Sequence, residues 1–144
     1  MRDKVRSKAW LAAVAVLLSG CSTMQGQPER ITGVWGGPHV GIDIQGGLAG
    51  VQFDCASGTI DDPLYPAPDG SFSGKGTYRT GAMGPIKVGQ FFKSQDAAFS
   101  GRIVKGAPRK GARVMTLNVA LEDGTALGPF TLSEGSAPQL TRCA

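Results

Sequence analysis

Apolar and polar residues alternate along most of the chain after residue 30, and glycine, proline or aspartate interrupts this alternation roughly every ten residues. The clearest runs cover residues 40–44 and 115–121. A period of two places every second side chain on the same face of a β-strand. Because 22 glycines and nine prolines leave no long uninterrupted window for a helix, the sequence predicts an all-β fold. Further strands are predicted over residues 51–55, 72–78, 86–92, 99–104, 130–132 and 138–143.

Many short strands with one apolar face form either a closed barrel or a sandwich. Short connections favour sequential hairpins, and closure removes exposed strand edges. We therefore expect one small antiparallel up-and-down β-barrel of about eight strands over residues 31–144, a length that suits a single domain. Glycines inside the predicted strands, such as Gly74, Gly76 and Gly101, suit bends in a tightly coiled sheet.

The first 20 residues have the pattern of a secretory signal. Four basic residues and one acid precede an apolar run over residues 9–18, and small Ser19 and Gly20 follow it. An apolar run of this length reaches about 15 Å as a helix, half of a hydrocarbon core. An uncleaved N-terminal membrane helix is the alternative, and its short length argues against it.

Leu18-Ser19-Gly20-Cys21 resembles the lipobox of bacterial lipoproteins. This resemblance implies removal of residues 1–20, a diacylglycerol on the sulfur of Cys21 and a palmitate-like acyl chain on the new amine. Each buried methylene contributes about 0.8 kcal/mol, so several chains anchor a small domain stably. Ser22, where some lipoproteins have Asp, implies the periplasmic face of the outer membrane, and the inner membrane is the alternative. The other interpretation of Cys21 is an ordinary thiol after a standard signal cut.

Residues 21–30 are polar and unpatterned, and they predict a flexible tether that reaches about 30 Å. The formal charge of +4 belongs mostly to the leader, so the remaining chain is close to neutral. The high pI is therefore no argument for binding nucleic acid.

Cys55 and Cys143 remain once Cys21 is set aside. In an oxidising envelope compartment this pair is most simply a disulfide. It closes a loop of 88 residues, for which the chain-entropy account gives about 4–5 kcal/mol. A redox pair is usually closer in sequence, and a metal site lacks ligands because His39 is the only histidine. The sequence predicts no metal and no cofactor.

Two further resemblances concern residues 31–144. Gly33-Val34-Trp35, together with Arg142, resembles the element of lipocalin-like and avidin-like barrels in which a first-strand Trp packs beneath a C-terminal Arg. Small periplasmic inhibitors of bacterial metalloproteases share such a barrel, a disulfide and an N-terminal arm that enters the protease cleft. The second resemblance is to small bacterial envelope proteins of unknown function, and it implies one domain with paired cysteines and no particular activity. It is carried by Trp35-Gly36-Gly37-Pro38-His39, Phe53-Asp54-Cys55-Ala56-Ser57-Gly58-Thr59-Ile60, Met115-Thr116-Leu117 and Phe130-Thr131-Leu132.

An eight-stranded barrel is either filled by side chains or hollow. Glycines at interior positions favour a cavity, which would bind a small apolar ligand. Its predicted lining consists of Trp35, Phe53, Phe99, Leu117 and Phe130. In a filled barrel Trp35 would instead close the floor.

His39 and Asp43 share a predicted strand face, and Asp54 is placed across the hairpin. Such a group can perform acid–base chemistry, but a polar cluster that ties two strands together is the more common role. No nucleophile motif is present, and neither remaining cysteine has a histidine neighbour in sequence. We therefore predict no catalytic residue.

One run of basic residues lies around a predicted hairpin tip at 107–111. It consists of Arg102, Lys105, Arg109, Lys110 and Arg113. Such a run binds anionic lipid, lipopolysaccharide or an acidic partner, or it is a solvated loop without a partner.

These observations predict a non-enzymatic binding module of the cell envelope. Its ligand is a small apolar molecule inside the barrel or an envelope protein or polymer on its rim. The alternatives are a protease inhibitor that acts through residues 22–30 and a purely structural envelope lipoprotein.

Overall fold

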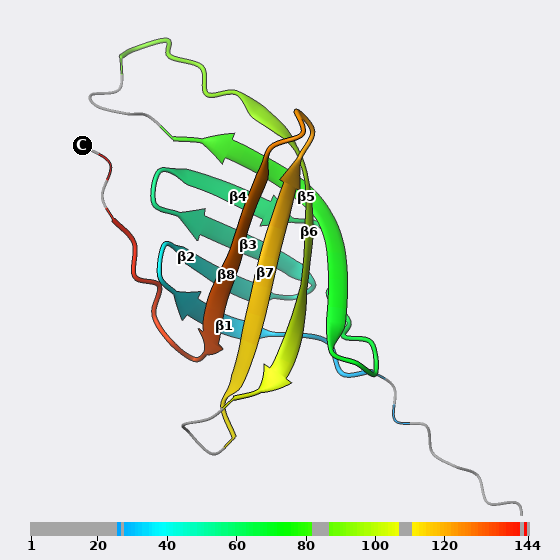
Figure 1. Cartoon of the computed structure of the whole chain (residues 1–144). Coiled ribbons are helices and arrows are strands. Elements are labelled where there is room, and N and C mark those ends of the chain that lie inside the picture. The colour runs from blue at the N-terminus through cyan, green and yellow to red at the C-terminus, as the bar shows by residue number, and fades with distance from the viewer. Residues whose placement is uncertain (1–25, 27, 82–86, 107–110, 142, 144) are drawn as a thin grey trace, which may run out of the picture.

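The computed structural model describes residue 26 and residues 28–81, 87–106, 111–141 and 143. Eight antiparallel strands follow one another in chain order around a closed barrel (Figure 1). This confirms the predicted all-β, up-and-down barrel. The strands are β1 (Gly33–Gly37), β2 (Val40–Gln45), β3 (Leu48–Phe53), β4 (Ala56–Ile60), β5 (Ser71–Thr80), β6 (Ser94–Lys105), β7 (Arg113–Leu121) and β8 (Ala126–Glu134). The predicted signal, Cys21 and most of the predicted tether lie outside the described residues.

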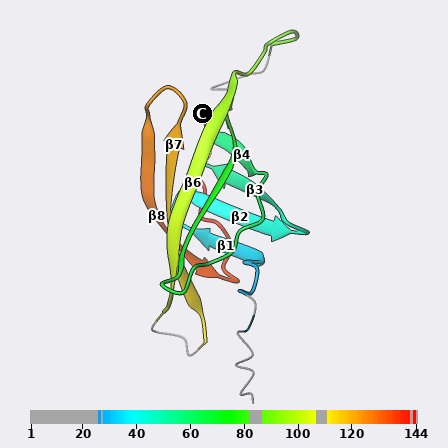
Figure 2. The same cartoon turned by 90° about the vertical axis from the view of Figure 1, so that its right-hand side faces the viewer.

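The barrel has a short side and a long side. Strands β1 to β4 have five or six residues each, whereas β5 to β8 have 9 to 12. In Figure 2 the long strands stand on one side and the short strands cross on the other. The seam between β1 and β8 is the shortest ladder, with Trp35 opposite Glu134 and Gly36 opposite Ser133.

The two ends of the barrel differ. At one end, here called the tether end, the chain enters β1 beside the β2–β3 turn and loop 61–70 (Figure 1). The amide of Ile31 donates to the carbonyl of Leu64 at 2.9 Å, and both side chains are buried. The opposite end, here called the far end, carries the β1–β2, β3–β4 and β5–β6 connections. Loop 61–70 therefore closes the barrel at the end from which the tether leaves.

Apolar side chains from all around the barrel form one core in its interior. Inward positions on β7, namely Met115, Leu117, Val119 and Leu121, are buried and alternate with more accessible ones. The largest fully buried side chains are those of Trp35 and Phe99. Among the described residues no polar or charged side chain is buried, so the barrel is stabilised by apolar packing. No helix in these residues is long and apolar enough to cross a bilayer.

Gly76 and Gly101 allow neighbouring strands to approach closely. A Cβ atom on Gly76 would overlap the carbonyl oxygen of Thr59, and one on Gly101 would overlap that of Thr116. Both glycines lie at inward positions of their strands, where the backbone of the neighbouring strand leaves no room for a side chain.

Three predicted strand segments differ in the structure. Residues 87–92 form a loop, because Gly89 has φ of 85° and turns the chain. In the predicted strand 138–143, the described residues 138–141 form no ladder beyond one parallel bridge between Pro38 and Gln139, since Pro138 has no amide hydrogen to donate. The run 51–55 ends earlier, at Phe53, and a separate strand β4 begins at Ala56.

Candidate binding site

The outer face of β2, β3 and β4 holds a groove of about 690 Å³, here called the outer groove. Its floor follows the strand register, in which Asp43 lies opposite Gly50 and Gly50 lies opposite Thr59. These three residues point outward, because they are exposed and alternate with less accessible neighbours on each strand. The groove is thus built on the outside of the barrel.

Gly50 gives the groove its depth. An ideal Cβ atom at this position meets no heavy atom within 4 Å, and the backbone is in an ordinary strand conformation. The outward neighbours Ser57 and Thr59 are also small. The hollow therefore results from missing side-chain volume on the two adjacent strands β3 and β4.

The walls of the groove are apolar. Val34 on β1 is 44% exposed and Leu48 at the start of β3 is 61% exposed. Pro138 belongs to the segment between the end of β8 and Cys143, here called the C-terminal segment. It completes the wall above Gly41. Exposed apolar walls around a concave surface are the usual feature of a binding site.

The groove is acidic. Asp43 and Asp61 are among its lining residues, and no lysine, arginine or histidine is. Both carboxylate oxygens of Asp43 accept from the Nε2 amide of Gln45 at 3.1 Å. This combination fits a ligand that presents a positive charge beside an apolar part.

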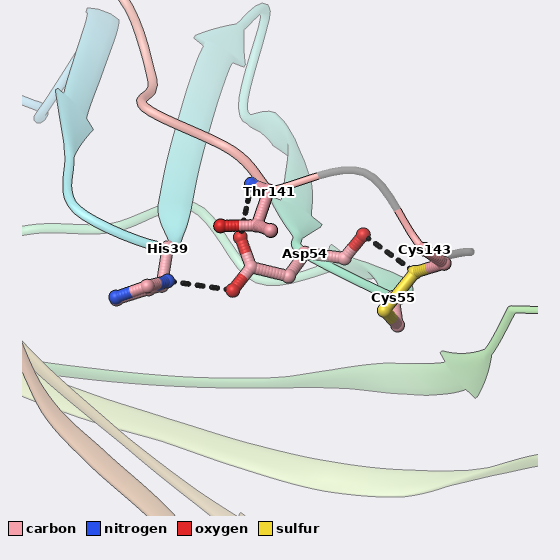
Figure 3. Close-up of a disulfide and its surroundings, with 5 residues drawn as sticks. All are labelled: His39, Asp54, Cys55, Thr141 and Cys143. Atoms are coloured by element: carbon pink, nitrogen blue, oxygen red, sulfur yellow. Dashed lines mark hydrogen bonds and ion pairs between the residues drawn. A yellow bond between two sulfur atoms is a disulfide. The ribbon is translucent and has the colours of Figure 1, made fainter.

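The C-terminal segment is fastened across the outside of β1 and β2. The amide of Gln139 donates to the carbonyl of Gly37 at 3.0 Å, and the amide of His39 donates to the carbonyl of Gln139 at 2.9 Å. Cys143 is bonded to Cys55 at the far end (Figure 3). This disulfide confirms the predicted pairing, and it holds the segment that carries Pro138.

His39 and Asp54 form part of the same fastening. His39 Nδ1 lies 2.6 Å from Asp54 Oδ2, and the amide of Thr141 donates to Asp54 Oδ1 at 2.7 Å (Figure 3). The hydrogen bond from Thr141 is the main reason that the pKa of Asp54 lies below its ordinary value, with a smaller contribution from His39. Asp43 is not part of this cluster. Its carboxylate accepts from Gln45, and His39 lies in the β1–β2 turn, not on the face of β2 that carries Asp43. The cluster therefore joins the β1–β2 turn to the C-terminal segment.

The five predicted cavity-lining residues all pack into one core. Trp35, Phe99 and Leu117 are fully buried. The centres of the Phe53 and Phe130 rings are 5.7 Å apart. The Tyr78 ring packs beside them, with its centre 5.5 Å from the centre of the Phe53 ring. Burial raises the pKa of the Tyr78 phenol. None of these residues lines the outer groove. Their role in ligand binding stays a prediction.

The basic residues that were assigned to an anionic surface are partly compensated by acids. Arg102 pairs with Asp69 at 3.3 Å, and Arg113 pairs with Glu134 at 2.7 Å. Lys105 is exposed at the end of β6, and Arg109 and Lys110 lie outside the described residues. Contact with an anionic surface also stays a prediction.

Sequence reasoning missed the outer groove. The available signal was the presence of the small residues Gly50, Ser57 and Thr59 at outward positions, but their adjacency depends on the strand register. Within the described ranges, no group of three His, Cys, Asp or Glu side chains is placed to hold a metal ion.

Comparisons with known proteins assign no relative to this chain. No protein-family profile, curated protein or solved structure matches it significantly.

Proposed function

We propose that this chain is a lipid-anchored, non-enzymatic binding protein of the bacterial cell envelope, with its barrel on the periplasmic side of the outer membrane. The anchor would be Cys21, acylated after removal of residues 1–20. The tether enters the barrel at the end closed by Ile31 and Leu64, so this end would face the membrane.

The observation that carries the proposal is the outer groove. An apolar core inside the barrel does not require a hollow on the outer face, whereas a ligand-binding site is usually concave. The groove joins the apolar walls Val34 and Leu48 to the carboxylates of Asp43 and Asp61. We infer that it binds an envelope component with a cationic group next to an apolar part.

Native mass spectrometry of the lipoprotein extracted in mild detergent tests this function. We expect an adduct that is lost on denaturation. Gly50→Trp fills the groove and should abolish the adduct, because the site has open space for a side chain. Asn118→Trp is the matched control, since it adds the same ring at an exposed outward position of β7. Equal amounts of the adduct in the two variants would show that the ligand does not bind in the outer groove.

A small apolar ligand inside the barrel is the second candidate. It is favoured by the half-buried rings of Tyr78 and Phe130, which pack at a tilt against the Phe53 ring. Phe130→Ala should then remove the adduct while Gly50→Trp retains it. The protease-inhibitor alternative predicts instead that deletion of residues 22–30 abolishes inhibition of a metalloprotease.

A further inference from the structure

Loop 87–93, between β5 and β6, presents two apolar side chains to solvent. Val88 is 108% exposed and Phe91 is 97% exposed, more than any other large apolar residue in the described chain. A single exposed apolar residue is common on protein surfaces. Two that lie three residues apart on one projecting loop at the far end (Figure 1) form a contact surface.

The loop has a defined shape. The amide of Gln90 donates to the carbonyl of Lys87 at 3.0 Å, and the amide of Lys87 donates to Gln90 Oε1 at 3.2 Å. At its base the guanidinium of Arg79 lies 5.1 Å from the centre of the Phe92 ring. A loop already held in one conformation loses less entropy when it binds.

The charge of the loop is opposite to that of the outer groove. Lys87 and Lys93 flank the apolar side chains, and residues 87–93 contain no acid. The groove presents Asp43 and Asp61 between apolar walls and has no basic lining residue. Apolar groups flanked by opposite charges on the two surfaces favour specific docking.

Within one molecule this contact is not made, because Val88 and Phe91 are fully exposed. We propose that loop 87–93 of one copy docks in the outer groove of a second copy. The inference rests on the proposed function, because it names the occupant of the same groove. The loop and the groove are different surfaces, and each copy carries both of them. The contact is therefore head-to-tail, and its repetition generates rows of molecules along the membrane.

The same residue types also suit a lipid surface, where basic and apolar side chains act together. The loop lies at the far end of the barrel, whereas the tether leaves from the other end (Figure 2). A lipid partner would therefore have to approach from the side opposite to the anchor. This placement favours a second copy as the partner.

Cross-linking of the full-length lipoprotein in membranes tests the proposal. Two differently tagged copies are co-expressed, one with Val88→Cys and the other with Leu48→Cys, and a short bismaleimide is added. We expect a mixed dimer at about tenfold higher yield than for the control pair of Val88→Cys with Asn118→Cys. Equal yields for the two pairs would overturn the proposal.

A charge exchange makes the test specific. The double change Lys87→Glu and Lys93→Glu should lower the cross-link about tenfold, and Asp43→Lys with Asp61→Lys on the other copy should restore it. These four side chains are exposed, so folding is not at risk. Loss without restoration, or capture of a different protein, would exclude a second copy as the occupant.

A fluorescent label on Val88→Cys separates a lipid partner from a second copy. A second copy predicts a blue shift that disappears when the neighbouring copies carry Gly50→Trp. A shift produced by phosphatidylglycerol vesicles alone, and unaffected by Gly50→Trp, would assign the loop to lipid. If the cross-link fails while Gly50→Trp still removes the native adduct, the proposed function stands and only this inference falls.

Discussion

The guanidinium of Arg113 lies 5.4 Å from the centre of the Trp35 ring. The same guanidinium donates to both carboxylate oxygens of Glu134, at 2.9 and 2.7 Å, and Glu134 is the register partner of Trp35. Three strands, β1, β7 and β8, are thereby joined at the seam where the barrel closes. Because the β1–β8 ladder is so short, this side-chain contact reinforces the closure.

Arg113→Met should lower the free energy of unfolding by about 1–2 kcal/mol. The Arg113 and Glu134 side chains are 35% and 31% exposed, so their ion pair should contribute more than a surface pair and less than a buried one. Urea unfolding followed by Trp35 fluorescence measures this loss. Arg102→Met breaks the more exposed pair with Asp69 and should cost less than about 1 kcal/mol. An equal effect of the two changes would contradict a special role for the seam.

Removing the disulfide should destabilise the barrel and release the C-terminal segment. We expect Cys55→Ser with Cys143→Ser to lose about 2–4 kcal/mol, because the bridge restricts the unfolded chain over 88 residues. Hydrogen exchange of the Gln139 amide, which donates to Gly37, should accelerate in the same variant. Unchanged stability and unchanged exchange would show that the bridge is dispensable.

The attachment of Thr141 should weaken in acid. The pKa of Asp54 is lowered from its ordinary 3.8, so its ionised form is favoured in the folded state, and this contribution is complete above about pH 5. This stabilisation is lost gradually as the pH falls from 3.8, the ordinary pKa, through the lower pKa that Asp54 has in the folded state. The chemical shift of the Thr141 amide reports the change. Asp54→Asn should remove this titration, and its persistence would assign it to another group.

Glycine substitutions should separate tight strand contacts from the open groove. Gly101→Ala should destabilise the barrel by about 2 kcal/mol or more, because its Cβ would overlap the carbonyl oxygen of Thr116. Gly50→Ala should change stability by less than about 0.5 kcal/mol, since its Cβ meets open space. Thermal unfolding of both variants provides the comparison, and similar losses would mean that the groove is not open.

The lipid anchor is testable through Cys21. Cys21→Ala should abolish labelling by an alkyne-bearing palmitate and leave the chain outside the membrane fraction, because the acyl chains provide the anchoring free energy. Cys143→Ser should retain the label. A membrane-bound Cys21→Ala protein would support the alternative of an uncleaved N-terminal helix.

The strand content, the barrel and the cysteine pairing could be predicted because each depends on a local or compositional signal. A period of two is a property of neighbours in the chain, as in the alternation of Met115, Leu117 and Val119 with outward residues. The prediction was wrong at residues 87–92, where a left-handed Gly89 and its turn outweigh the apolar run.

The candidate site depends on register and on the path of the C-terminal segment, which no local pattern encodes. Gly50 becomes a groove floor only because it lies between Asp43 and Thr59, and Pro138 becomes a wall only because the segment to Cys143 is fastened over β2. The basic run predicts that Arg113 contacts an anionic surface, whereas in the structure its guanidinium lies over the Trp35 ring. A one-residue change of register would reverse every side chain of a strand, so these contacts exist only once the long-range pairing is complete.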